Sequence, residues 1–133
     1  MKTRLWLTAL LIPIFGYASY FSDGMRAYRT GNYTEAKKLF EQAIEEDGAE
    51  QARFFLGLLY LDGKGVDRNL HAAKQFLQKA ADIGNARAKC YLAKVYLQQK
   101  KPDKQKALKL LKEGLDAGAD ECSAIAAAYK IPL

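Results

Sequence analysis

Apolar residues recur along most of the chain at intervals of three and four, the spacing that places them on one face of an α-helix. Between residues 39 and 44 they fill the first, second, fifth and sixth places, and from 52 to 60 they recur every fourth place. In a β-strand, apolar and polar residues would alternate instead. Turn-forming residues separate these segments at Asp47-Gly48, Asp62-Gly63-Lys64-Gly65, Gly84-Asn85, Lys101-Pro102-Asp103 and Gly118. The pattern therefore predicts an all-α protein of short helices.

Two interleaved series of similar segments run through the chain. The first comprises residues 35–40, 72–77 and 106–111, at spacings of 37 and 34. The second comprises residues 56–60, 92–96 and 125–129, at spacings of 36 and 33. Self-similarity near 34 residues is typical of stacked helical hairpins, and two series indicate two helices per repeat. Small residues such as Gly57 and Ala93 recur where the helices of a hairpin must approach closely.

The middle of the chain carries a regular set of small, apolar and basic residues, namely Leu56, Gly57, Tyr60, Gly63, Gly65, Val66, Ala73, Phe76, Lys79, Ala80, Ala81 and Gly84. About ten of these positions agree in order and spacing with a Sel-one-like repeat, a relative of the tetratricopeptide repeat, so this segment resembles that family. The resemblance continues less strictly through residues 86–118. The first repeat is more similar to the ordinary tetratricopeptide form, with its shorter turn.

This resemblance implies a right-handed α-solenoid of about three repeats, at 20–48, 49–84 and 85–118, closed by a cap at 119–133. The first helix of each pair should line a concave groove that holds a protein or peptide. By the family's pattern, the groove positions are Met25, Tyr28, Gln51, Phe54, Leu58, Arg87, Lys94 and Gln98. Phe54 and Leu58 could instead pack between repeats.

The N-terminus has the order of a signal peptide. Lys2 and Arg4 precede an apolar run over residues 5–15, which is followed by Gly16-Tyr17-Ala18. A membrane-spanning helix needs roughly 20 residues, so this run of 11 favours cleavage over anchoring. We expect residues 1–18 to be removed, leaving residues 19–133 as a periplasmic or secreted domain without stable membrane insertion.

The charge is moderately basic and unevenly distributed. The whole chain carries a net charge of +6, and removing Lys2 and Arg4 leaves 19 basic and 15 acidic residues, or +4. Residues 86–133 hold ten basic and five acidic side chains. This excess could steer an acidic partner toward the C-terminal half, but it is too small to indicate nucleic acid. The densest cluster, which we interpret as a solvated helix face, is Lys100, Lys101, Lys104, Lys106, Lys109 and Lys112.

The residues offer little for catalysis. His71 is the single histidine and has no surrounding motif. Gly63 and Gly65 lack the Gly-Lys-Ser/Thr ending of a phosphate loop, and no strand precedes them. We therefore expect a non-enzymatic protein without a metal or cofactor.

Cys90 and Cys122 are the two cysteines. The 33-residue spacing maps Cys90 to the position next to Cys122, on the first helices of adjacent repeats. A disulfide suits an exported protein, but it needs Cα atoms about 4.4–6.8 Å apart, closer than most packed helices allow. The sequence is therefore compatible with either a disulfide between the two cysteines or two buried thiols.

Together these observations predict a protein-protein interaction module of the cell envelope, acting as a scaffold or adaptor for a protein or peptide that could be acidic. The alternative is a small inhibitor or immunity-type protein that neutralises one enzyme or toxin. Three repeats and a cap offer a modest surface, which suits one dedicated partner.

Overall fold

The computed structural model describes residues 19–133, and the predicted signal peptide at 1–18 lies outside this range. Within 19–133 the ordered elements are helices, with no strand. They are α1 (Tyr20–Arg29), α2 (Tyr33–Asp47), α3 (Ala52–Asp62), α4 (Leu70–Asp82), α5 (Ala86–Gln98), α6 (Lys104–Asp116) and α7 (Glu121–Ala128). None of these helices is long and apolar enough to cross a membrane.

The helix ends follow the turn chemistry of the sequence. Four helices begin with a side chain that accepts a hydrogen bond from the backbone N–H three residues later, which satisfies one free donor of the first turn. These N-cap residues are Ser19, Asn69, Asn85 and Asp103. Helix α3 is capped at its C-terminus by Gly63, whose φ of 65° is left-handed and strains any residue with a Cβ. Local sequence therefore sets where these helices start and stop.

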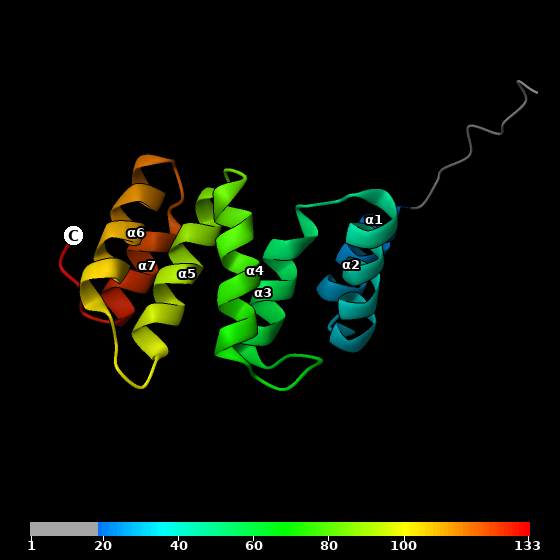
Figure 1. Cartoon of the computed structure of the whole chain (residues 1–133), viewed down its shortest axis with the longest axis horizontal. Helices are drawn as coiled ribbons and strands as arrows, with labels where there is room; N and C mark the ends of the chain where they lie inside the picture. The colour runs from blue at the N-terminus through cyan, green and yellow to red at the C-terminus, as the bar shows by residue number, and fades with distance from the viewer. Residues whose placement is uncertain (1–18) are drawn as a thin grey trace, which may run out of the picture.

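Consecutive helices pair as hairpins, and the pairs follow one another along the long axis of the molecule (Figure 1). Helices α1 and α2, α3 and α4, and α5 and α6 form the three pairs, while α7 packs on α5 and α6. A small residue lies at the crossing of α3 with α4: a Cβ added to Gly57 would stand 2.6 Å from Leu77 Cγ. The close approach expected at Gly57 is thus present.

The apolar interior is continuous through α3. One group of buried side chains, including Phe40, Leu56 and Leu59, lies between the first hairpin and α3. A larger group, including Phe54 and Leu77, extends from α3 to α7. Because α3 supplies side chains to both groups, each hairpin buries its apolar surface against the next one. This stacking leaves the remaining side of each first helix free to form a surface.

Candidate protein-binding surface

The first helices of the pairs, α1, α3 and α5, present one side away from their second helices. Each residue of an α-helix turns the chain by about 100°, so the residues opposite Gly57 on α3 can be placed from the backbone. The corresponding residues of α5 lie 36 positions later. We call this surface the first-helix face; on α3 and α5 it comprises Gln51, Phe55, Leu58, Asp62, Arg87, Tyr91, Lys94 and Gln98.

Most of the predicted groove residues are accessible, but two are not. Six of them are partly or fully exposed, namely Met25, Tyr28, Gln51, Arg87, Lys94 and Gln98. Phe54 and Leu58 are only 2% and 7% exposed. Phe54 turns toward the next repeat, and Leu58 is covered at the edge of the face. The prediction that these two side chains meet a partner is corrected: they pack between repeats.

Phe54 is buried beneath the first-helix face and contacts two of its residues, Arg87 and Tyr91. The Arg87 guanidinium carbon lies 5.0 Å from the centre of the Phe54 ring, and the Tyr91 ring centre lies 5.7 Å away. Arg87 also forms an ion pair with Glu121 of α7. The Arg87 guanidinium therefore already has a cation–π contact and an ion pair within the protein. Arg87 thus links α5 to Phe54 of α3 and to Glu121 of α7.

Aromatic rings form a row across α1, α3 and α5. The ring centres of Tyr28 and Phe55 are 5.5 Å apart, those of Phe55 and Phe54 5.2 Å, and those of Phe54 and Tyr91 5.7 Å. Burial is the main cause of a raised pKa at Tyr28, and nearby Asp62 adds to it, so this hydroxyl stays neutral. Phe55 and Tyr91 were missed in the sequence, although they are related by the 36-residue repeat spacing.

A depression lies on this face between α5 and α7, with a volume of about 510 Å³. Its polar lining comes from Lys94, Gln98, Tyr91 and Tyr129, and its apolar lining from Ala124, Ile125 and Ala128. Gln98 accepts a hydrogen bond from Arg68 and donates one to the Tyr129 hydroxyl at 2.6 Å. The depression is therefore shaped by the third repeat and the cap together.

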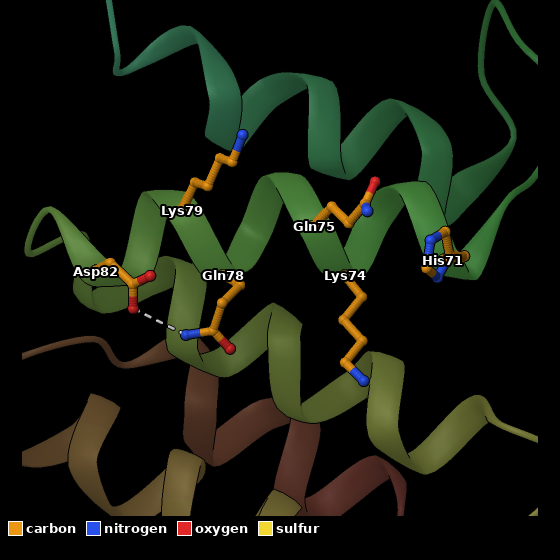
Figure 2. Close-up of a pocket in the computed structure, with 6 residues that line it drawn as sticks. All are labelled: His71, Lys74, Gln75, Gln78, Lys79 and Asp82. Carbon is orange, nitrogen blue, oxygen red and sulfur yellow. Dashed lines mark hydrogen bonds between the residues drawn. The ribbon is translucent and has the colours of Figure 1, made fainter.

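The outer side of α4 offers a second set of polar side chains, but they do not converge. Figure 2 shows six residues that all belong to α4, with Lys79 and Gln75 directed to one side of the helix and Lys74 and Gln78 to the other. His71 stands apart at the helix start. Across residues 19–133, moreover, no three His, Cys, Asp or Glu residues lie close enough to hold a metal ion. This face has the arrangement of a solvated helix surface.

The two cysteines form a disulfide between α5 and α7. The Cα atoms of Cys90 and Cys122 are 4.7 Å apart, and both residues are fully buried. Helix α6 comes close at Gly114, where an added Cβ would lie 3.1 Å from Cys90 Sγ. The bridge thus fixes α7 beside the depression, and of the two states left open by the sequence, the structure holds the bonded one.

The lysine cluster lies mainly on and before α6, away from the first-helix face. Lys100, Lys101, Lys104, Lys106, Lys109 and Lys112 are all exposed. Lys109 approaches Glu113 at 3.9 Å, and Lys106 lies 5.3 Å from the centre of the Tyr96 ring. Exposed pairs of this kind contribute little to stability.

Stacked helical hairpins with an open face on their first helices define a helical repeat protein. Three Sel1 repeats match residues 15–48, 50–85 and 86–118, so the chain belongs to the Sel1 repeat family. Sel1 repeats generally mediate protein-protein interactions, and proteins built from them are typically non-enzymatic scaffolds.

The chain is also similar to the crystal structure of a Sel1 repeat protein from Oxalobacter formigenes. The two share 28% sequence identity with a TM-score of 0.69. The match covers 85% of this chain but 49% of the other, so this chain spans about half the length of that protein.

Proposed function

We propose that this protein is an exported, non-enzymatic interaction module that holds a segment of one partner protein on its first-helix face, acting as an envelope scaffold or adaptor. The observation that carries the proposal is the gathering of Tyr28, Phe55, Tyr91 and Lys94 on one face, beside the depression between α5 and α7. Aromatic side chains are favoured anchors at protein interfaces, because they bury much area at low entropic cost.

Two observations support export. The charged, apolar and small-residue order of residues 1–18 is that of a cleaved signal peptide. The disulfide between Cys90 and Cys122 suits an oxidising compartment, since cytosolic thiols are kept reduced. N-terminal sequencing of the protein from its native cell should return Ser19 as the first residue. Intact Met1 in the membrane pellet would overturn export with cleavage.

Site-specific photo-crosslinking in living cells tests the binding face. A photoreactive residue replaces Gln51 on the first-helix face or, as the control, Gln78 on the outer side of α4; both side chains are exposed. We expect one defined adduct from position 51 and none from position 78. Equal adducts from both positions, or an adduct from position 78 alone, would contradict the proposed face.

A further inference from the structure

Lys94 lines the depression between α5 and α7, and no acidic side chain within residues 19–133 pairs with its ammonium. Arg87 on the same helix pairs with Glu121, and Lys89 pairs with Glu113 at 3.3 Å. Lys94, in contrast, forms no ion pair with any residue in 19–133, and no aspartate or glutamate lines the depression. The ammonium of this partly buried lysine attracts a carboxylate from outside the molecule.

A hydrogen-bond chain orients a second donor, the Tyr129 hydroxyl, which lines the same depression as Lys94. The Arg68 guanidinium has only donors, so the Gln98 oxygen must face Arg68, where the Oε1–Nη2 distance is 2.5 Å. The Gln98 amide nitrogen then faces Tyr129 and donates to its hydroxyl oxygen at 2.6 Å. Because that oxygen already accepts this bond, the Tyr129 hydroxyl proton is free to point to another acceptor.

The rest of the depression suits the stem of a side chain rather than a free ion. Ala124 and Ala128 are small and exposed, and with Ile125 they form an apolar wall opposite Lys94. Tyr91 contacts the buried Phe54 ring, and beyond it Phe55 and Tyr28 are partly exposed on the same face. A bound chain can therefore continue along the first-helix face instead of ending at Lys94.

We propose that this depression binds an internal acidic segment of the partner protein, with one glutamate or aspartate carboxylate held by the Lys94 ammonium and the Tyr129 hydroxyl. The methylenes of that side chain lie against Ala124 and Ala128, and flanking apolar residues of the segment follow the aromatic row. The excess of basic residues in 86–133 increases the encounter rate with such a segment. This assignment rests on the proposed function and names the chemistry of its partner.

Peptide display on the purified full chain tests the assignment without knowledge of the partner. Random peptides are joined to the display protein through their C-termini, so that none has a free C-terminal carboxylate, and those that bind are selected. The best sequence is then synthesised with an acetylated N-terminus and an amidated C-terminus. We expect it to contain a glutamate or aspartate beside an apolar residue. Lys94→Glu should weaken its binding about tenfold or more. Lys112→Glu on α6 makes the same charge change outside the depression and should leave the affinity within about twofold.

Two further variants test separately the Lys94 ammonium and the Tyr129 hydroxyl as partners of the carboxylate. Replacing the critical acidic residue of the peptide by lysine should weaken binding to the unmodified protein, and Lys94→Glu should restore much of that loss. Tyr129→Phe removes the hydroxyl, and with it the acceptor of the Gln98 amide, and should weaken binding about threefold or more while circular dichroism shows that the chain stays folded.

The outcomes separate the two proposals. If selected peptides bind Lys94→Glu as well as the unmodified protein, or carry no carboxylate, the acidic-segment assignment is wrong while the binding function stands. If a selected peptide binds only when its own C-terminal carboxylate is free, the assignment of an internal acidic segment is also wrong. If position 51 gives no more adduct than position 78, the first-helix face is not the binding surface and the proposed function itself fails.

Discussion

At the scale of single residues, small side chains decide how closely the helices approach. Gly57 on α3 faces Leu77 on α4, and a Cβ in its place would lie 2.6 Å from Leu77 Cγ and 2.8 Å from Leu77 Cδ2. Carbon atoms that are not bonded prefer separations of about 3.5–4.0 Å, so the Leu77 side chain or one of the two helices would have to move. Gly24 meets the ring of Phe40 in the same way in the first hairpin.

Gly57→Ala should therefore lower the free energy of unfolding by about 1–3 kcal/mol through overpacking, even though alanine favours the helix. Urea denaturation measures the loss. The same substitution in a Leu77→Ala background should cost less, because the clashing side chain is absent. An equal cost in both backgrounds would show that Gly57 and Leu77 do not limit the approach of α3 to α4.

Phe54 illustrates a residue that supports the binding face without forming it. Its side chain is 2% exposed and lies under Arg87 and beside Tyr91. Phe54→Ala should reduce the free energy of unfolding by about 3–5 kcal/mol, the usual loss for a buried phenylalanine. Phe55→Ala, at a partly exposed neighbour, should cost less stability but weaken peptide binding. Thermal melts and peptide titrations compare the two variants, and the opposite order in stability would contradict this assignment.

At the scale of elements, α7 is the least self-sufficient helix. It has eight residues, and helices shorter than about 12 residues are marginal in water without tertiary contacts. Its contacts to α5 and α6 include the Cys90–Cys122 disulfide and the ion pair of Glu121 with Arg87. The depression depends on this docking, since Ala124, Ala128 and Tyr129 form one of its walls.

Replacing both Cys90 and Cys122 by alanine should lower the free energy of unfolding by about 3–4 kcal/mol, the value expected for a bridge between residues 32 positions apart. Amide hydrogen exchange should increase most in α7. Peptide binding should weaken with it, because the wall of the depression loosens. As a control, Ser123→Ala changes an exposed neighbour on α7 and should leave all three measurements unchanged. Unaltered stability of the double variant would show that packing alone holds α7.

At the scale of the whole molecule, charge and the specific contacts lie on different surfaces. The lysine cluster is exposed on and before α6, whereas Lys94 and the aromatic row belong to first helices. Exposed charges act over distance and are screened within about 8 Å at physiological ionic strength. The lysine cluster should therefore influence how fast an acidic partner arrives more than how long it stays.

The variant Lys104→Glu with Lys109→Glu should reduce the association rate of the selected acidic peptide several-fold at low salt and little at physiological salt. Its dissociation rate should stay the same. Stopped-flow fluorescence at two salt concentrations measures both rates. A large increase in the dissociation rate at physiological salt would place the binding site on α6 instead of the first-helix face.

The sequence by itself determined the helices, their pairing and the repeat phase. Period, turn residues and self-similarity are local or regularly spaced, so they predicted breaks at Asp47-Gly48 and Asp62-Gly63, where the structure ends α2 at Asp47 and α3 at Asp62. The N-cap side chains and the close approach at Gly57 follow from the same local chemistry. Six of the eight groove residues that the family resemblance implied are accessible.

Only the tertiary structure decided which neighbouring residue faces the surface. One position along a helix turns a side chain by about 100°, so the same repeat phase admits either Phe54 or Phe55 on the face, and packing of α3 against α5 buries Phe54. The Arg87–Glu121 pair and the Arg68–Gln98–Tyr129 chain join residues about thirty positions apart. Their contacts, like the approach of Cys90 to Cys122, depend on how the repeats stack, and no local pattern encodes that distance.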